Sequence, residues 1–202
     1  ELAHVDHFFG TSDSNKIINF ICSEAHHKFD PDFNRIHLTP KHYGYLKISE
    51  GCDNGCSFCS IPLMRGLQKS QPIEWNIQEA KRMSGQGTKE ILVIAQDSTS
   101  YGWDLSPRTS LDKLLESLND LSEIDWIRLH YAHPAHLKKK IIDCFKSLDK
   151  IVPYIDMPIQ HASNRILKSM RRGLNIEGIK RKIGELKEVA PNIAIRTSLI
   201  VG

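Results

Sequence analysis

Short apolar runs alternate with longer stretches of helical periodicity through most of the chain. Runs rich in β-branched residues predict strands, and stretches whose apolar positions recur every three or four residues predict helices. The pattern predicts five strands, at residues 43–49, 90–96, 126–132, 154–160 and 193–201. It predicts helices between them, at residues 72–87, 110–121, 135–148, 163–171 and 176–189.

Strands that alternate with helices predict a parallel sheet joined by right-handed crossovers. Such an α/β fold is either an open, doubly wound sheet or a full or partial barrel, and the pattern alone does not decide between them. In both forms the chemistry lies at the carboxyl ends of the strands. We therefore expect functional residues in the segments that follow the strands, at 52–59, 96–101, 130–133 and 160–163.

The first 42 residues lack this alternation and resemble the tail of a preceding domain followed by a linker. Ser12, Asp13 and Ser14 precede an apolar-periodic stretch and indicate the start of a helix. Residues 30–42 hold two prolines and no clear period, which is typical of a linker. Both ends look cut, so we interpret the chain as a fragment, with residues 1–42 as tail plus linker and residues 43–202 as a core domain.

Composition narrows the class of protein. With 202 residues, 40% of them hydrophobic, the chain can bury one sizeable core. The formal net charge of +3 is too small to argue by itself for a nucleic-acid partner. No long apolar run predicts a membrane span, so we expect no membrane partner. Two of the five cysteines, Cys22 and Cys144, lie far from the others, which does not suit a disulfide framework and favours a reducing cytoplasm.

The other three cysteines, Cys52, Cys56 and Cys59, form a C-x3-C-x2-C motif directly after the first expected strand. One interpretation is half of a zinc site completed by a histidine, in a non-catalytic, zinc-stabilised binding module. A closed ferredoxin-type cluster needs four thiolates and different spacings. The remaining interpretation is a four-iron, four-sulfur (4Fe-4S) cubane in which the protein holds three irons and leaves one position open, as catalytic metals generally have.

This spacing, with Phe58 just before the last cysteine, resembles the radical S-adenosylmethionine (radical SAM) superfamily. The resemblance implies that S-adenosylmethionine chelates the open iron and that Phe58 lies against its adenine. Within the superfamily, "YGYLKISEGCDNGCSFCSIPLMRG", "LVIAQDSTSYGWDL", "IRLHYAHPAHL" and "YIDMPIQHASNRILKSMRRG" resemble the RimO-type methylthiotransferases. The resemblance covers about residues 40–202 and implies a partial (β/α) TIM-like barrel of the radical SAM type, truncated after the fifth strand.

RimO-type enzymes act on the small-subunit ribosomal protein S12, so the resemblance implies a transferase that methylthiolates the β-carbon of an aspartate. It also implies an electron donor such as flavodoxin or ferredoxin, and a second 4Fe-4S cluster in a separate N-terminal domain. Only Cys22 lies upstream of Cys52, so this chain alone is expected to be incomplete as an enzyme. Gln71 stands where the family often has arginine, so a charge contact of the family at this position is not carried over to this chain. The related enzymes that modify adenosine in transfer RNA are the alternative within the superfamily.

Further polar residues follow the other expected strands. By the resemblance, Gln96 and Asp97 are candidates for holding the methionine amino group, with an ordinary strand-end turn as the alternative. Gln160 and His161 follow the fourth strand and face the same way. Arg196 lies within the fifth strand, where an arginine is expected only if it points into the barrel towards a carboxylate.

Several other features have simpler explanations. Three histidines resemble a metal triplet but straddle a strand end and a helix start, so we expect surface or packing roles for His130, His133 and His136. The basic stretches at 138–140 and 170–173 are interpreted as solvated faces, with docking to ribosomal RNA as the alternative. Cys144 lies on an expected helix and is interpreted as a small buried hydrophobic residue.

Overall fold

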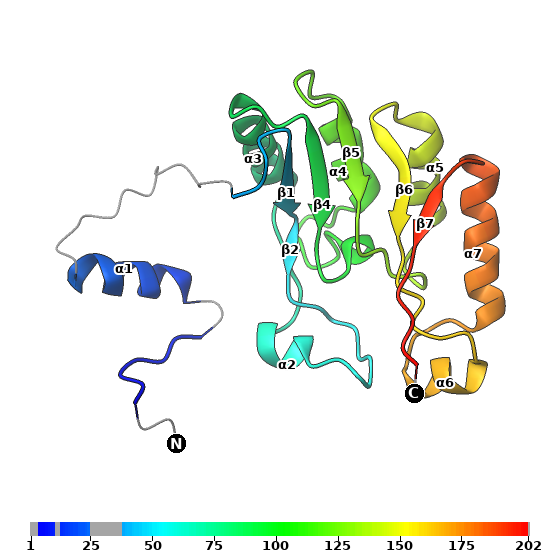
Figure 1. Ribbon diagram of the computed structural model, residues 1–202, viewed down its shortest axis with the longest axis horizontal. Helices are drawn as coiled ribbons and strands as arrows, with labels where there is room; N and C mark the ends of the chain where they lie inside the picture. The colour runs from blue at the N-terminus through cyan, green and yellow to red at the C-terminus, as the bar shows by residue number, and fades with distance from the viewer. Residues whose placement is uncertain (1–3, 11–12, 25–37, 202) are drawn as a thin grey trace.

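A five-stranded parallel sheet dominates the computed structural model, which describes residues 4–10, 13–24 and 38–201 (Figure 1). The strands stand side by side in chain order, and each is paired in parallel with the next. They are β1 (Tyr43–Lys47), β4 (Glu90–Ile94), β5 (Trp126–Leu129), β6 (Ile151–Asp156) and β7 (Ala194–Arg196). Among the described residues, no helix is long and apolar enough to cross a membrane.

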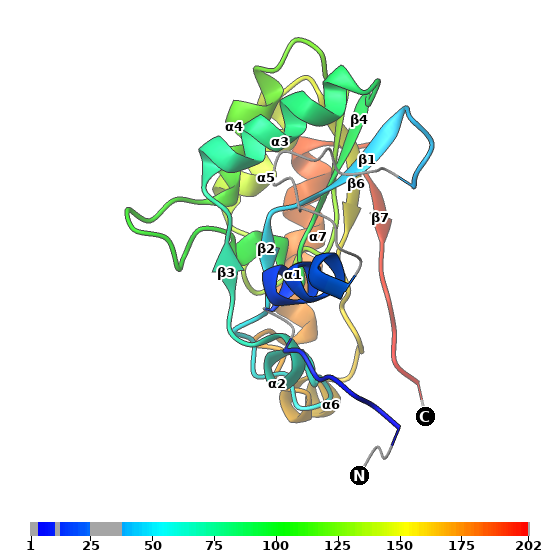
Figure 2. The ribbon, with the colours of Figure 1, turned by 90° about the vertical axis from the view of Figure 1, so that its left-hand side faces the viewer.

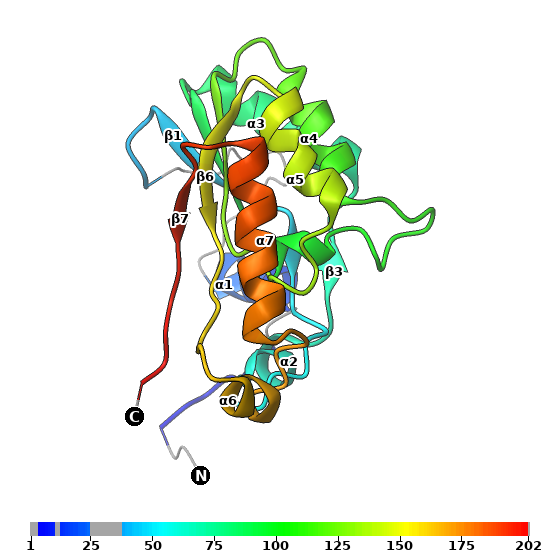
Figure 3. The ribbon, with the colours of Figure 1, turned by 90° about the vertical axis from the view of Figure 1, so that its right-hand side faces the viewer.

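The four long crossover helices all lie on one face of this sheet (Figures 2 and 3). They are α3 (Ile73–Gly85), α4 (Leu111–Asn119), α5 (Lys139–Ser147) and α7 (Ile176–Val189). A doubly wound sheet carries helices on both faces and reverses its strand order, and this sheet does neither. The fold is therefore a partial barrel with its helices outside, which decides between the two predicted α/β forms.

The hydrophobic core lies between the sheet and these helices. Ile91 and Val93 on β4 and Ile127 and Leu129 on β5 are fully buried, and they alternate with less buried residues along each strand. Helix α4 contributes a matching apolar stripe at i, i+3, i+4 and i+7, made of Leu111, Leu114, Leu115 and Leu118. Burying one such leucine stabilises the fold by about 1.5–3 kcal/mol.

Several predicted boundaries are wrong: β4 and β5 end at residues 94 and 129 instead of 96 and 132, and three further elements differ more. Helix α5 begins four residues later than predicted, because a turn in which His136 N–H donates to the carbonyl of His133 (3.0 Å) precedes it. Strand β6 begins at Ile151 and ends at Asp156 instead of covering residues 154–160, and it includes Pro153. Proline lacks an N–H for the ladder, and the pairing of β5 with β6 is irregular along this stretch. Strand β7 ends at residue 196 rather than 201.

The first predicted strand divides into two. Strand β1 ends at residue 47, and β2 (Ser49–Glu50) pairs antiparallel with β3 (Lys69–Ser70). The excursion between β2 and β3, residues 51–68, carries the cysteine motif and helix α2 (Ile61–Arg65). The β2–β3 pair thus closes the base of the cysteine excursion directly beyond the carboxyl end of β1.

The segment before the sheet contains helix α1 (Ser14–Glu24), where the sequence predicts a helix start. Ser12 and residues 30–37 of the expected linker lie outside the described residues. Within the described part of the chain, the buried core residues run from Leu46 to Ile193, and α1 contributes none of them. The division of the chain at residue 42 stays a prediction.

Candidate functional site

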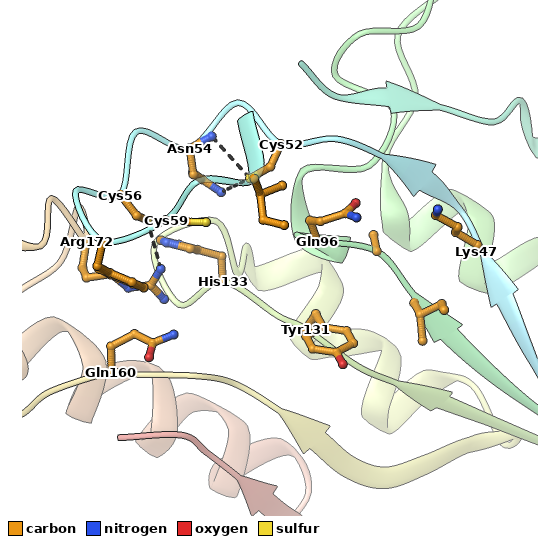
Figure 4. A pocket seen from close by; sticks show the side chains of 14 residues that line it. Lys47, Cys52, Asn54, Cys56, Cys59, Gln96, Tyr131, His133, Gln160 and Arg172 are labelled. Carbon is orange, nitrogen blue, oxygen red and sulfur yellow. Dashed lines mark hydrogen bonds between the residues drawn. The ribbon is translucent and has the colours of Figure 1, made fainter. Parts of the chain in front are cut away.

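A pocket opens at the carboxyl ends of the strands, where the sequence predicts the functional residues (Figure 4). The three cysteines of the motif line it, together with residues at or beyond the ends of β1, β4, β5 and β6. The lining consists of Lys47, Cys52, Asn54, Cys56, Phe58, Cys59, Ile61, Ile94, Ala95, Gln96, Tyr131, His133, Gln160 and Arg172. Segments far apart in the sequence therefore meet at one place, as a parallel α/β fold requires.

The cysteine loop is held in a tight conformation by its backbone. It begins at Gly51, whose φ of 76° lies in the left-handed region that favours glycine. The N–H of Cys52 donates to the carbonyl of Gly66 at 3.2 Å, which ties the start of the loop to its return. Cys52 is buried, Cys56 and Cys59 are half-buried, and all three are free thiols. Three unpaired thiols thus face one pocket.

Two of the thiols receive hydrogen bonds from nitrogen donors. Asn54 donates to Sγ of Cys52 from its backbone N–H (3.4 Å) and from its side-chain Nδ2 (3.3 Å). Nη1 of Arg172 donates to Sγ of Cys56 at 3.3 Å. Burial is the main cause that raises the pKa of the Cys52 thiol, and the Asn54 donors oppose it. Donors of this kind favour a sulfur that carries negative charge, as a metal-bound thiolate does.

The spacing of the thiols separates the two metal interpretations of the motif. Around a single tetrahedral zinc, with Zn–S bonds of about 2.3 Å, sulfurs lie only about 3.8 Å apart. Within the described part of the chain, the one set of three such ligand atoms within 4.8 Å of one another belongs to Asp97, His133 and His136, not to the cysteines. At least one pair of the three sulfurs is therefore more than 4.8 Å apart, which suits a cluster in which each sulfur binds a different iron. The donor set therefore fits a multi-iron cluster better than a zinc ion.

Asp97 lies behind the cysteine loop rather than in the pocket lining. It is buried and caps the short helix η1 (Ser98–Ser100) by accepting from the N–H of Thr99 at 3.0 Å. Its Oδ2 accepts from Nδ2 of Asn54 at 2.9 Å and lies 2.7 Å from Nδ1 of His136. Burial alone raises the pKa of Asp97, but the hydrogen bonds from His136, Thr99 and Asn54 outweigh it and lower the pKa to about 2. Asp97 is thus an ionised carboxylate at the centre of a hydrogen-bond network.

This lowered pKa predicts a loss of stability in acid. A carboxyl group whose pKa falls from 3.8 in the unfolded chain to about 2 in the folded one stabilises the fold at neutral pH. The contribution is about 2 kcal/mol, present above about pH 4 and lost as the pH falls towards about 2. We expect the free energy of unfolding of the Asp97→Asn variant, measured by urea denaturation, to fall less steeply than that of the wild type over this window. The exposed Asp120→Asn variant is the matched control and is expected to follow the wild type, and an equal slope for Asp97→Asn would contradict the prediction.

The three histidines near this network differ in position. His133 lines the pocket and is buried, and its ring stacks on His136 with centroids 4.7 Å apart. Burial, with the charge of Arg172 as a second cause, lowers the pKa of His133 to about 4, so its ring is neutral at pH 7. Burial also lowers the pKa of His130, which lies outside the pocket lining. The stacked pair agrees with the predicted packing role.

Three other predicted site residues line the pocket. Nε2 of Gln96 donates to Oε1 of Glu50 at 2.9 Å. Oε1 of Gln96 is buried and has no hydrogen-bond partner among the described residues. Gln160 adopts a left-handed φ of 71° where the chain leaves β6. Phe58 is 44% exposed, so its ring is available to a ligand. All three side chains line the same pocket as the cysteines.

Besides Asp97, two predicted residues lie outside the pocket lining. Nη1 of Arg196 lies 3.3 Å from Oδ2 of Asp156, a fully buried carboxylate on the neighbouring strand. This placement agrees with the expectation that Arg196 points towards a carboxylate. His161 accepts a hydrogen bond at Nδ1 from the N–H of Ser163 at 2.8 Å, which is a local turn contact.

The prediction that residues 170–173 form a solvated face is wrong for Arg172, which is only 5% exposed. It follows helix α6 (Asn164–Ser169) and reaches the cysteine loop, 116 residues away along the chain. Residues 138–140 are exposed, as predicted. Cys144 is buried, and burial raises the pKa of its thiol to about 12, as suits the predicted hydrophobic role. Sequence reasoning also missed Asn54, Lys47 and Tyr131 as lining residues.

The fold and the three-cysteine pocket define a class of protein. A sequence model of the radical SAM superfamily matches residues 46–202, and the chain belongs to that superfamily. Among solved structures, the radical S-adenosylmethionine methyltransferase TsrM from Kitasatospora setae has a TM-score of 0.64 at 14% identity, over 84% of this chain and 35% of that one. The cobalamin-dependent S-adenosylmethionine radical enzyme OxsB has a TM-score of 0.63 at 15% identity, over 77% of this chain and 23% of that one. At such low identity these structures show the fold alone.

Curated relatives are more specific. The ribosomal protein uS12 methylthiotransferase RimO of Christiangramia forsetii is 45% identical over 202 residues, which is 100% of this chain and 44% of that protein. The protein of the same name from Myxococcus xanthus is 44% identical over 211 residues, again 100% of this chain and 44% of the relative. The predicted resemblance to the RimO type is confirmed. The chain spans less than half the length of these relatives.

Proposed function

We propose that the protein carrying this chain is a methylthiotransferase that acts on the β-carbon of an aspartate in ribosomal protein S12. The observation that carries the proposal is the pocket in which Cys52, Cys56 and Cys59 meet at the carboxyl ends of a partial radical SAM barrel. The 45% identity to proteins named uS12 methylthiotransferase supports this target over transfer RNA. The spacing of the thiols supports a cluster over a zinc-stabilised module.

In this proposal the three thiolates hold a 4Fe-4S cluster, and S-adenosylmethionine occupies the rest of the pocket. When bound, this pair supplies radical chemistry that removes hydrogen from an unactivated carbon. Phe58 offers an aromatic face to the adenine, and the unpartnered Oε1 of Gln96 and the side chain of Gln160 offer hydrogen bonds to the polar groups. Asp97 is assigned to the loop through Asn54 rather than to the methionine amino group, because it does not line the pocket.

The pocket wall also limits the access of water. Ile61, Ile94 and Ala95 contribute apolar surface beside the thiols, and His133 is neutral at pH 7. These apolar side chains disfavour water beside the thiols, which protects a radical reaction from quenching, while the cations of Lys47 and Arg172 line other parts of the same pocket. Arg196 lies outside this wall, beside Asp156, and we propose that it faces the barrel interior towards the target.

The remaining parts of the activity are proposed from the resemblance. A second 4Fe-4S cluster belongs to a separate N-terminal domain, residues 1–42 form the end of that domain with its linker, and residues 43–202 belong to the radical SAM core. An electron donor such as flavodoxin or ferredoxin reduces the cluster. The exposed basic residues at 138–140 are available for contact with ribosomal RNA. A ribosomal substrate places the enzyme in the cytoplasm.

The test uses the full-length protein. We expect the reduced enzyme, given S-adenosylmethionine and a sulfur source, to add the mass of a methylthio group to an aspartate of S12, detected by peptide mass spectrometry. Transfer RNA is incubated in parallel with the enzyme. A methylthio group found on adenosine, and not on S12, would show that transfer RNA is the target. A colourless protein with stoichiometric zinc and no iron would show a binding module.

A further inference from the structure

Arg172 is a buried cation placed against a cysteine thiol. Its side chain is 5% exposed and comes from the turn after α6 (Figure 4). Nη1 donates to Sγ of Cys56 at 3.3 Å, and Nη2 donates to the carbonyl of Pro158 at 2.7 Å. One guanidinium thus joins the cysteine loop to the segment that follows β6. Burying a cation is costly unless it meets negative charge, and no carboxylate in the described residues is paired with it.

The backbone around Arg172 fixes this position. Ser57, next to Cys56, donates from its N–H to the carbonyl of Met170 (3.2 Å) and from its hydroxyl to the carbonyl of Ser169 (2.8 Å). These two carbonyls belong to the end of α6, where helix carbonyls lack partners within the helix. The last turn of α6 is therefore fastened to the cysteine loop, and Arg172 enters the pocket from a fixed point.

A second fixed donor lies at Cys52. Nδ2 of Asn54 donates to Sγ of Cys52 (3.3 Å) and to Oδ2 of Asp97 (2.9 Å). An ionised carboxylate only accepts hydrogen bonds, so Asp97 determines that the amide nitrogen, and not the amide oxygen, faces the sulfur. Asp97 is itself held by Thr99 and by His136. The orientation of Asn54 is thus set from behind by a buried carboxylate.

We propose that Arg172 and Asn54 raise the reduction potential of the cluster by holding N–H donors on the sulfurs of Cys56 and Cys52, and that Asp97 is the positioning residue that keeps the amide nitrogen of Asn54 on the sulfur of Cys52. The inference rests on the proposed function, because it concerns a cluster on these cysteines. Reduction adds one negative charge to the cluster, and a donor or cation at a ligand sulfur stabilises the more negative state. The effect is large where the cation is shielded from water, as Arg172 is.

The first experiment compares Arg172→Met with Arg171→Met in the full-length protein. Both variants remove one positive charge at adjacent positions, but Arg171 is exposed and contacts neither cysteine. The cluster of this chain is identified as the spectroscopic signal that is lost in Cys56→Ala, and its midpoint potential is measured by a redox titration followed by electron paramagnetic resonance. We expect Arg172→Met to lower the ratio of reduced to oxidised cluster at least tenfold at a fixed ambient potential, which is about 59 mV for one electron. Arg171→Met is expected to match the wild type.

The conservative variant Arg172→Lys separates charge from geometry. Lysine keeps the charge but lacks the planar fork that reaches both the sulfur and the carbonyl of Pro158. We expect an intermediate potential, with a fall in the ratio of about threefold. If Arg172→Met does not retain its iron, Arg172→Lys tests the inference instead. A midpoint potential of Arg172→Lys equal to that of the wild type would then contradict the role of the Arg172 guanidinium in raising the potential.

The second experiment compares Asn54→Leu with Asn192→Leu. Neither substitution changes the charge of the protein, and Asn192 is exposed and lies outside the cysteine excursion. We expect Asn54→Leu to lower the midpoint potential in the same direction as Arg172→Met, because it removes the Nδ2 donor from Sγ of Cys52. Asn192→Leu is expected to leave the potential unchanged.

The failure of this inference is distinguishable from the failure of the proposed function. If the wild-type protein binds no iron at Cys52, Cys56 and Cys59, the proposed function itself is contradicted. A wild-type protein that holds the cluster, together with Arg172→Met and Asn54→Leu variants that keep both iron and wild-type potential, would leave the proposed function intact and overturn the inference.

Discussion

Replacing Cys56 with alanine in the full-length protein is expected to remove one cluster's share of iron and sulfide and to abolish cleavage of S-adenosylmethionine. The motif offers three thiolates, and Cys56 is the one whose sulfur also receives a hydrogen bond from Arg172. A cubane that keeps only two of its three protein ligands is bound too weakly to be retained. The measurement is an iron and sulfide assay after anaerobic reconstitution, with absorption in the visible range.

The matched control for this variant is Cys22→Ala. Cys22 is a free thiol on α1, outside the pocket lining, so its removal tests the general effect of losing a thiol during reconstitution. It is expected to leave the iron content and the cleavage of S-adenosylmethionine unchanged. A Cys56→Ala variant that keeps the full complement of iron would show that this cysteine is not a ligand.

The second large effect is expected at Gly51, directly before the first cysteine. Its φ of 76° is strained for any residue with a side chain, and a Cβ placed there would lie 2.3 Å from the carbonyl oxygen of Leu67 and 2.6 Å from that of Gly66. Both neighbours are backbone atoms, which cannot move out of the way by a change of rotamer as a side chain can. The left-handed conformation costs alanine about 1–2 kcal/mol, and forcing the backbone apart adds about 1–3 kcal/mol. Gly51→Ala is expected to lower the free energy of unfolding by about 3 kcal/mol and to reduce cluster retention.

Gly55, in the middle of the same loop, provides the comparison. A Cβ at Gly55 would meet no atom within 4 Å. We expect Gly55→Ala to change the free energy of unfolding by no more than about 0.5 kcal/mol. Urea denaturation of both variants and an iron assay after reconstitution test the pair. Equal behaviour of the two variants would contradict the close approach of Gly51 to the backbone of Gly66 and Leu67.

The sequence predicted the fold class well, because it depends on patterns that repeat. Five apolar runs separated by helical stretches are enough to indicate a parallel sheet, and helix α7 has the predicted bounds. The boundaries near Pro153 and His133 were wrong because they depend on single hydrogen bonds and on one missing N–H. Strands β2 and β3 have two residues each, which is too short to leave any periodicity.

The site was predictable only where residues lie close together in the sequence. The C-x3-C-x2-C motif can be recognised because its three members lie within eight residues. Arg172 could not be recognised, because "MRRG" has the composition of a solvated stretch and its burial depends on contacts between α6 and a loop more than a hundred residues away. The position of Asp97 beyond a strand is visible in the sequence, but its hydrogen bond to Asn54 can be seen only in the three-dimensional structure.

The chain-order arrangement of the strands has a consequence for how this site can change during evolution. Most of the pocket lining comes from the separate connections that follow β1, β4, β5 and β6, while the ladder of hydrogen bonds belongs to the strands themselves. A mutation or insertion in one connection therefore alters one side of the pocket and leaves the scaffold and the other sides in place. Divergence towards new targets can proceed connection by connection, without a redesign of the sheet.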